Sequence, residues 1–263
     1  MSLARSKKRP AALRSMLENG APVVLAVALL VVWQVAVPVL GISPFVLPTP
    51  WMIVTRIGSD FGLLMTHAYV TALEVLYGFG LAVIVGVPTG LMIFYSRVVE
   101  KAVYPLLVAL QTIPKVVLAP LLVLYLGYGW APKIFLAFLI SFFPIVISTV
   151  VGLQTLEKSM VNLLRSMGAT EVQTFFKLRL PAALPSMFGG FKVAIGLSVI
   201  GAVIGEYVAA ERGLGYLQLQ AGSQFDTTLS FAAVVVISAM GVLFFSIVSL
   251  IERWVVFKRD VAL

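Results

Sequence analysis

Six apolar windows constrain this chain more than any other feature. They cover residues 22–40, 69–95, 103–126, 133–153, 187–210 and 229–251. Each is long enough to cross the hydrocarbon core of a membrane, which needs about 20 helical residues. Membrane-spanning strands alternate apolar and polar residues at every second position, and these windows do not. The sequence therefore predicts an all-α integral membrane protein with six transmembrane helices.

The composition agrees with this fold class, because 60% of the residues are hydrophobic and only 11% are charged. An ordinary soluble domain has about 25% charged residues. The first window follows the basic residues Arg5, Lys7, Lys8, Arg9 and Arg14, which is also the arrangement of a cleaved signal peptide. The window is too long for a signal peptide and does not end in a small-x-small cleavage site, so we expect it to remain as the first span.

The distribution of Lys and Arg predicts the orientation of the spans. With an even number of spans and a cytoplasmic amino terminus, fifteen of the nineteen basic residues fall in cytoplasmic segments. Arg56, Lys133 and Arg212 fall outside, and Lys115 lies within the third span. Cytoplasmic segments of membrane proteins carry the excess of basic residues. Both termini, including the segment 1–21, are therefore expected in the cytoplasm.

The charge and the composition exclude several kinds of function. The net charge of +8 does not indicate nucleic-acid binding, because the basic residues flank apolar spans instead of forming a stripe on a soluble face. A chain without Cys has no disulfide, thiolate or Cys-based metal site, and the single His, His67, excludes a site of several His ligands. We assign His67 no function, since a histidine near the outer end of a span is typically a solvated polar anchor.

Between the first two windows, the segment 41–66 changes character at Trp51. Three prolines in 42–50 prevent a regular helix before that residue. From Trp51 to Leu64, apolar residues recur at helical spacing. This pattern predicts a short amphipathic helix in the outer interface of the membrane, and a loop packed on the bundle explains it equally well.

The segment 154–186, called the hairpin below, is the longest polar stretch between two windows. Apolar residues in its first half recur at three- and four-residue spacing, and a second run begins at Thr170, which forms a capping-box pattern with Gln173. Gly168 separates the two runs, and Pro181 is expected to end the second helix. The sequence therefore predicts a cytoplasmic unit of helix, tight turn and helix whose apolar face needs a partner.

The hairpin resembles the cytoplasmic signature of bacterial ABC-importer permeases. That signature reads Glu-Ala-Ala, three residues, Gly, nine residues and Ile-x-Leu-Pro. Here Gly168 is followed after nine residues by Leu178-Arg179-Leu180-Pro181, and Asn162-Leu163-Leu164 stand in place of Glu-Ala-Ala. The departure leaves open what these three positions do, while the Gly and the Leu-Pro keep the geometry of the hairpin.

Four further segments resemble the nitrate, sulfonate and taurine branch of these permeases, which also includes carriers of bicarbonate, pyrimidine precursors and riboflavin. They are Leu47-Pro48-Thr49-Pro50, the run 111–121, Phe142-Phe143-Pro144-Ile145 and Gly213-Leu214-Gly215-Tyr216. Within the run 111–121, the variant Pro114-Lys115-Val116-Val117-Leu118-Ala119-Pro120 is closer to the pyrimidine and riboflavin members. The resemblance thus extends over nearly the whole chain, and it implies a single transmembrane permease domain over 1–263 with the type I importer fold.

The resemblance also implies a function in the bacterial inner membrane, namely the path for a small polar solute. The implied partners are a second copy of the permease, two cytoplasmic ATPase subunits and an extracytoplasmic solute-binding protein. The residues implied in coupling to the ATPase are Gly168, Ala169, Thr170, Glu171, Val172, Leu178, Leu180 and Pro181. The chain has no Gly-Lys dipeptide and hence no phosphate-binding loop. We therefore expect a transport subunit without enzymatic activity or cofactor of its own, with ATP and Mg²⁺ on the ATPase.

The candidates for the translocation path are Gln111, Pro114, Lys115, Pro144 and Glu206. An ionisable side chain at mid-membrane costs about 2.5–3.5 kcal/mol, so it needs a polar surface or a partner. Lys115 in the third window either faces the path or forms an ion pair with Glu74 or Glu206. For the two glutamates, structural pairing or snorkelling explains the position better than a place on the path.

The prolines of the third window, Pro105, Pro114 and Pro120, must bend or break its helix. Broken backbone is tolerated at membrane depth where it lines a cavity or is buried in protein. This favours the third window as part of the path, and simple packing kinks are the alternative.

Two other functions fit the sequence less well. A membrane-embedded hydrolase would need paired intramembrane aspartates, a Gly-x-Ser-x-Gly element or a second His, which the chain lacks. An ion-coupled carrier or a channel without an ATPase agrees with the spans and leaves the hairpin unexplained.

Overall fold

The computed structural model describes residues 11–260, with the backbone alone for residues 11–20, 158 and 257–260. The basic residues Arg5, Lys7, Lys8 and Arg9 lie outside the described part. In order along the chain, the elements are α1 (Ala11–Val39), α2 (Pro50–Ser59), α3 (Phe61–Tyr95), α4 (Arg97–Thr112), α5 (Lys115–Leu126), α6 (Trp130–Gln154), α7 (Lys158–Ser166), α8 (Glu171–Thr174), the π-helical turn η1 (Phe175–Arg179), α9 (Leu180–Ala209), α10 (Leu214–Ser223) and α11 (Thr227–Asp260). The all-helical prediction is confirmed for the described residues.

Within residues 11–260, five helices are long and apolar enough to cross a membrane, or six if the bent pair α4 and α5 counts as one span. Five predicted windows coincide with α1, α3, α6, α9 and α11, and the windows 22–40 and 187–210 each extend one residue past their helix. The third window is not one helix, because α4 and α5 meet at an angle of 98°. Pro114 causes the break, since a proline forces the preceding residue out of helical geometry, and Ile113 is extended with φ −71° and ψ 125°.

Helix α6 lies at the centre of the bundle and makes its most extensive contacts with α9 and α3. Glycine pairs at four-residue spacing permit close contact between membrane helices. The pair Gly86 and Gly90 on α3 packs against Ile145 and Thr149 of α6, and the pair Gly201 and Gly205 on α9 packs against the first turns of α6. Both glycine pairs therefore face α6. Their four-residue spacing indicates close helix contact but does not identify the partner helix.

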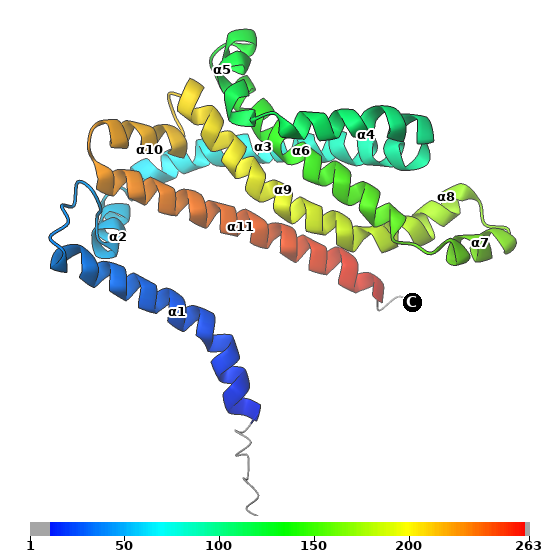
Figure 1. Ribbon diagram of the computed structural model, residues 1–263, viewed down its shortest axis with the longest axis horizontal. Helices are drawn as coiled ribbons and strands as arrows, with labels where there is room; N and C mark the ends of the chain where they lie inside the picture. The colour runs from blue at the N-terminus through cyan, green and yellow to red at the C-terminus, as the bar shows by residue number, and fades with distance from the viewer. Residues whose placement is uncertain (1–10, 261–263) are drawn as a thin grey trace, which may run out of the picture.

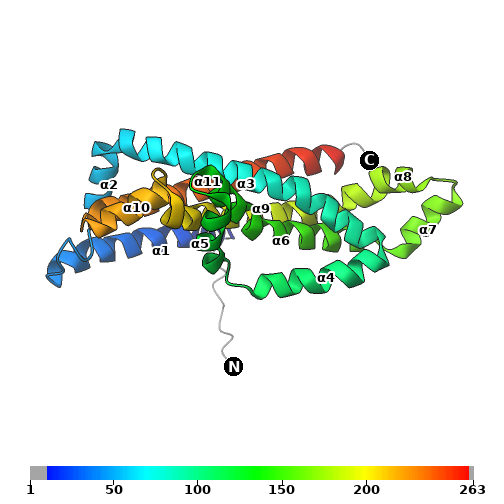
Figure 2. The same ribbon diagram turned by 90° about the horizontal axis from the view of Figure 1, so that it is seen from above.

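The elements predicted outside and the hairpin lie at opposite ends of the molecule. Figures 1 and 2 show α2 and α10 at one end of the bundle and α7 with α8 at the other. In Figure 1, α1 diverges from the bundle, and only 6% of its apolar stretch, Ala21–Val39, is buried. These apolar side chains of α1 face outward, as expected of a helix in contact with lipid.

The amphipathic helix predicted from Trp51 is confirmed as α2 as far as Ser59, and the last predicted residues, Phe61 and Leu64, belong to α3 instead. Thr49 accepts a hydrogen bond from the Met52 N–H (3.4 Å), and Pro50 occupies the first turn, where its missing N–H has no cost. Ile53 is buried in the core cluster that includes α11. The helix therefore packs on the bundle with its apolar face, which combines the two interpretations of this segment.

The turn of the hairpin is confirmed in detail. The Ala169 N–H donates to the Leu164 carbonyl and the Gly168 N–H to the Arg165 carbonyl, both at 3.0 Å. These two bonds form a Schellman motif, which needs a residue in the left-handed region, and Gly168 has a φ of +82°. The capping box of Thr170 with the residue three positions later is also present.

Pro181 does not end the second helix of the hairpin, so that expectation was wrong. The chain is helical without interruption over Glu171–Ala209. A π-helical turn, Phe175–Arg179, comes directly before Pro181, and the Leu180 N–H donates to the Phe175 carbonyl five residues earlier. A proline clashes with the carbonyl four residues before it in a regular helix. The wider π turn at this position lets the helix continue through the proline.

The packing of α6 on α9 gives the first prediction. A Cβ added to Gly201 would lie 2.6 Å from the Cα of Ala137, a backbone atom that cannot move aside, whereas one added to Gly196 would meet open space. We expect Gly201→Ala to destabilise the protein by about 1–3 kcal/mol through overpacking. Gly196→Ala on the same helix is the matched control and should unfold at or slightly above the wild-type temperature in detergent. Equal unfolding temperatures for the two variants would contradict the packing.

Candidate functional site

The break between α4 and α5 brings three of the predicted path residues together. Lys115 begins α5 and Gln111 lies in the last turn of α4, on either side of Pro114. The Lys115 Nζ lies 3.4 Å from the Gln111 carbonyl, and it also lies 5.2 Å from the centroid of the Phe143 ring on α6. The ammonium group thus has a carbonyl and an aromatic face as neighbours, and its side chain is half-buried.

The other two predicted path residues lie elsewhere. Pro144 follows Phe143 on α6, and its carbonyl faces α9, 3.0 Å from the position that a Cβ on Gly190 would take. Glu206 is 1% exposed near the carboxyl end of α9. That Pro144 and Glu206 line the translocation path stays a prediction.

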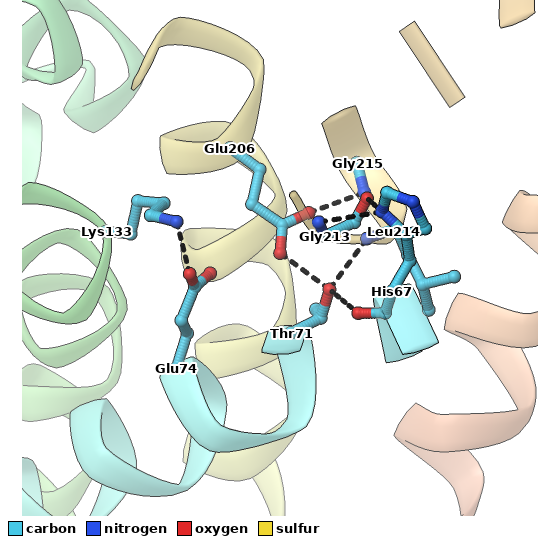
Figure 3. Close-up of polar contacts among 8 residues, drawn as sticks. All are labelled: His67, Thr71, Glu74, Lys133, Glu206, Gly213, Leu214 and Gly215. Atoms are coloured by element: carbon cyan, nitrogen blue, oxygen red, sulfur yellow. Dashed lines mark hydrogen bonds and ion pairs between the residues drawn. The ribbon is translucent and has the colours of Figure 1, made fainter. Parts of the chain in front are cut away.

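The ion pair proposed as the alternative role of Lys115 belongs to another lysine. Lys133 Nζ pairs with the Glu74 Oε1, and the two side chains are 5% and 0% exposed. Glu74 Oε2 has no hydrogen-bond partner among the described residues. The charge count placed Lys133 on the outer side, at the start of the window 133–153, and its side chain is buried in the first turn of α6 against α3 (Figure 3).

Glu206 and Thr71 hold the amino end of α10, in a set of contacts called the α10 network below. The Thr71 hydroxyl donates to the Glu206 Oε1 at 2.6 Å and accepts from the Leu214 N–H at 2.8 Å. The Gly215 N–H donates to the Glu206 Oε2 at 2.5 Å. A helix leaves its first amides without partners and attracts negative charge there, so a buried carboxylate is a suitable cap for α10.

His67 belongs to the same network. The Gly213 N–H donates to the His67 Nδ1 at 3.0 Å, and the Gly213 carbonyl lies 2.9 Å from the same atom. Gly213 has a φ of +124°, and a side chain on it would meet the Glu206 carboxylate. His67 is half-buried, and its ring is a polar anchor as expected, with the loop before α10 as its partner.

The sequence contained one signal for the Glu74–Lys133 pair, namely the depth of the two residues in the membrane. Both residues lie near the amino ends of windows that run from outside to inside in the predicted topology. They therefore share one depth in the membrane, whereas Lys115 was placed mid-span.

The α10 network had a weaker signal in the sequence, since its hydrogen bonds use backbone amides that any residue carries. Figure 3 shows the Glu74 and Glu206 carboxylates next to each other, between Lys133 and the loop 213–215.

The hairpin presents an exposed apolar surface at the end of the molecule opposite α10. The side chains of Met160, Leu163, Met167, Val172 and Phe176 are all more than half exposed. Of the predicted coupling residues, Gly168, Thr170, Glu171 and Val172 are exposed and Ala169 is half-buried. Leu178, Leu180 and Pro181 are half-buried, and Leu180 packs against a core cluster with Leu153 and Met187. The tip of the hairpin is therefore free for a partner, and its base is fixed to the bundle.

Two charged contacts stabilise the orientation of the hairpin. Arg165 and Glu171 form an exposed ion pair across the turn. The Arg179 guanidinium lies 5.0 Å from the ring centroid of Phe94 and 5.9 Å from that of Tyr95. Cation–π contacts of this kind stabilise by about 0.5–2 kcal/mol. The contacts of Arg179 hold the base of the hairpin against the end of α3.

Among the described residues, no cluster of three or more His, Cys, Asp or Glu side chains has an arrangement that could hold a metal ion.

Comparison with known families gives one match, over residues 78–257, to the binding-protein-dependent transport system inner membrane component. Among curated proteins, the chain is 38% identical over 233 residues to the formylaminopyrimidine transport permease protein of Halalkalibacterium halodurans, covering 88% of this chain and 93% of that protein. It is 37% identical over 239 residues to the riboflavin transport system permease protein of Chloroflexus aurantiacus, covering 90% and 89%. The taurine transport system permease protein of Escherichia coli is 29% identical over 226 residues, covering 83% and 82%.

Among solved structures, the fold is similar to a chain of the methionine ABC transporter MetNI in inward-facing conformations. The TM-score is 0.66 at 20% sequence identity, and the match covers 75% of this chain and 98% of the other. At this identity the likeness concerns the fold, and it confirms the permease fold that the sequence resemblance implied.

The α10 network predicts that Glu206 stabilises the amino end of α10. Glu206→Ala removes the acceptor of the Gly215 N–H and leaves buried donors without partners, which costs about 1–3 kcal/mol. We expect a lower unfolding temperature and faster thiol labelling of an Ala221→Cys reporter, which is buried in α10. Glu211→Ala, in the exposed loop before α10, is the control and should leave both readouts unchanged. A Glu206→Ala variant that protects the reporter as the wild type does would contradict the capping role.

Proposed function

This chain belongs to the family of binding-protein-dependent transport system inner membrane components, and we propose that it forms the solute path of an ATP-driven importer as its permease subunit. It is a multi-pass protein of the inner membrane, and its relatives are transport permeases of ABC importers, not enzymes. In the proposal, 1–263 forms a single transmembrane domain with six spans, α4 and α5 together making the third. Both termini then lie in the cytoplasm.

The observation that carries the coupling to an ATPase is the hairpin. Its tip has an ordered turn and exposed apolar side chains, while its base is held by Leu180 and Arg179. Apolar patches of this kind on a soluble surface mark sites of protein contact. We infer that residues 158–180 dock into a groove on the ATPase, with Gly168 at the turn and 169–172 at the contact. ATP and Mg²⁺ then act on that partner.

The remaining partners follow from the family. The proposed assembly is a symmetric homodimer of the permease with two ATPase subunits and an extracytoplasmic binding protein. The family description supports the binding protein, and the match to the methionine ABC transporter supports the ATPase. An ion-coupled carrier or a channel is the second candidate, and it would not copurify with an ATPase. Single cysteines, introduced into a chain that has none, test the homodimer by cross-linking.

The solute path is proposed to run beside the break between α4 and α5. The backbone is interrupted at Pro114, and irregular backbone at membrane depth is tolerated beside a water-filled cavity or when buried in protein. Lys115 at this break is half-buried and lies over the Phe143 ring. The alternative in which Lys115 pairs with Glu74 or Glu206 does not hold, because these glutamates contact Lys133 and the α10 network instead.

Gly168→Leu tests the coupling surface. A leucine at φ +82° strains the turn, and its side chain has open space, so the bundle itself should fold and insert normally. We expect ATP hydrolysis that no longer drives transport when the variant is reconstituted with its ATPase. Gly41→Leu is the matched control, since Gly41 also has a positive φ (+62°) and open surroundings at the other end of the molecule. Normal coupled transport by Gly168→Leu would sink the proposed docking.

Lys115→Met tests the path. If Lys115 faces the path, the variant should assemble with the ATPase at wild-type yield and transport at least about tenfold more slowly, a loss of about 1.4 kcal/mol. A cysteine at position 115 should react with polar thiol reagents at a rate that changes with ATP. Lys101→Met on the exposed face of α4 is the control and should transport normally. Poor assembly together with an unreactive cysteine would assign Lys115 a structural role.

A further inference from the structure

The carboxyl groups of Glu74 and Glu206 face each other where α3 and α9 meet, next to the amino end of α10 (Figure 3). They lie within reach of a direct hydrogen bond between the two side chains. Glu74 is 0% exposed and Glu206 is 1% exposed, so bulk water does not screen the two groups from each other. Two carboxyl groups in such contact do not both ionise, because the like charges repel.

Among the described residues, the other contacts of these carboxyls leave one oxygen without a hydrogen-bond donor. Glu206 accepts from the Thr71 hydroxyl at 2.6 Å and from the Gly215 N–H at 2.5 Å. Lys133 forms its ion pair with the Glu74 Oε1, and no donor reaches the Glu74 Oε2. A buried acceptor without a donor is unfavourable. A proton on the pair supplies the donor, since a protonated carboxyl has one O–H and still accepts from its other partners.

The charges of Glu74, Glu206 and Lys133, called the carboxyl cluster below, lead to the same conclusion. If both carboxyls are ionised, one ammonium faces two carboxylates, and one negative charge is left in excess. An uncompensated buried charge is strongly destabilising, and a buried ionisable group takes up or releases a proton in preference to staying charged alone. One proton on the pair makes the carboxyl cluster neutral.

The other charged or titratable groups at this end of the described chain have surroundings of their own. Glu211 and Arg212, in the loop before α10, are exposed, so water screens their charges. Arg56 pairs with two aspartates, and His67 contacts the backbone of Gly213. Tyrosine side chains carry no charge near neutral pH. The complete set is His67, Arg56, Asp60, Glu211, Arg212, Asp226 and the tyrosines of α3, α9 and α10.

A cavity of about 480 Å³ connects the carboxyl cluster with solvent. Lys133 lines this cavity, together with Val70 of α3 and Ala209 of α9. Val70 and Glu74 are about one helical turn apart, and so are Ala209 and Glu206. Protons therefore reach the two carboxyls from the end of the molecule that carries α10, where the predicted topology places the outside.

We propose that Glu74 and Glu206 form a proton-binding site in which the two carboxyls share one proton, and that this proton keeps α10 docked on the bundle. Glu206 connects the site to α10 through the Gly215 N–H. When the proton leaves, the repulsion between two carboxylates acts on the residue that caps α10. The site belongs to the bundle itself and is independent of the proposed function.

The sign of the pH dependence follows from the number of bound protons. When α10 undocks, water reaches the two carboxyls, and both ionise. The docked state therefore binds one proton more than the undocked state. A rise in pH favours the state with fewer protons, so the undocking equilibrium constant should increase by up to about tenfold per pH unit.

The test uses infrared spectroscopy on the full permease in complex with its ATPase, in a maltoside detergent that has no carbonyl group. Glu74→Gln and Glu206→Gln each leave one carboxylate beside Lys133, a neutral arrangement that needs no shared proton. The control is Glu252→Gln, because Glu252 on α11 has a lysine of its own, Lys192, at 2.8 Å.

We expect the wild type to show the C=O band of a protonated carboxyl at about pH 7, far above the usual range of a glutamate. The band should shift in D₂O and disappear as the pH is raised. Both Glu74→Gln and Glu206→Gln should lack it and unfold near the wild-type temperature, since neither leaves an unpaired buried charge. Glu252→Gln should keep the band.

Thiol labelling of Ala221→Cys, buried in α10, measures undocking. Its rate is divided by that of Ser59→Cys on the exposed face of α2, which cancels the ionisation of the thiol itself. In the wild-type background this ratio should increase with pH by up to about tenfold per pH unit. In the Glu206→Gln background it should stay constant, because the glutamine amide replaces the bound proton permanently.

Four results would overturn the proposal. The first two are the absence of the carboxyl band from the wild type at neutral pH and its survival in both glutamine variants. The third is a labelling ratio that still increases with pH in Glu206→Gln, which would assign the titration to another group such as His67. The fourth is a sodium-dependent rise in the unfolding temperature of the wild type that both glutamine variants lack, which would place a metal cation between the carboxylates instead of a proton.

Discussion

The close approach of α6 to α3 and α9 is the constraint on which the rest of this structure depends. Helices in lipid gain little from the hydrophobic effect, so they associate through van der Waals packing and hydrogen bonds at small residues. Gly78 and Gly201 let α3 and α9 contact the same residue of α6, Ala137. At this separation the Ser198 hydroxyl of α9 donates to the Val75 carbonyl of α3 at 3.0 Å. The same approach also brings Lys133 within reach of Glu74, so the packing determines which charges can be buried.

The sequence predicted the elements whose cause is local. Apolar windows of about 20 residues predict spans because the thickness of the membrane is fixed. The hairpin turn was predicted because Gly168 and Thr170 satisfy requirements of the adjacent backbone, and the structure has both motifs as expected. A bend or break of the third window was expected from Pro105, Pro114 and Pro120 alike, but the chain breaks only at Pro114, since Pro105 and Pro120 lie inside α4 and α5. The angle of 98° was not expected, because a proline removes a hydrogen bond without determining where the next helix packs.

The sequence did not predict features whose cause lies in another element. Pro181 was expected to end a helix, and it does not, because the π turn before it relieves the clash. Lys133 was placed on the outer side without a partner, and only the position of Glu74 on α3 makes its burial possible. Likewise, Gly213 and Gly215 appeared only as part of the resemblance, and their need for close backbone approach becomes visible only with the Glu206 carboxylate beside them. Pairings between spans depend on depth and rotation, which a single sequence does not contain.

The two ends of the molecule are joined by one continuous helix. Glu171–Ala209 contains 39 residues and therefore extends about 58 Å at 1.5 Å per residue. Its first residue lies in the exposed part of the hairpin, and Glu206 near its other end caps α10. A helix of this kind moves as a rigid body unless it has a hinge. The π turn is the place where a hinge would form, and there Arg179 contacts Phe94 and Tyr95 of α3. A displacement of the hairpin therefore reaches the Lys133 and α10 end through α9 without needing a chain of side-chain contacts, provided that the π turn stays rigid.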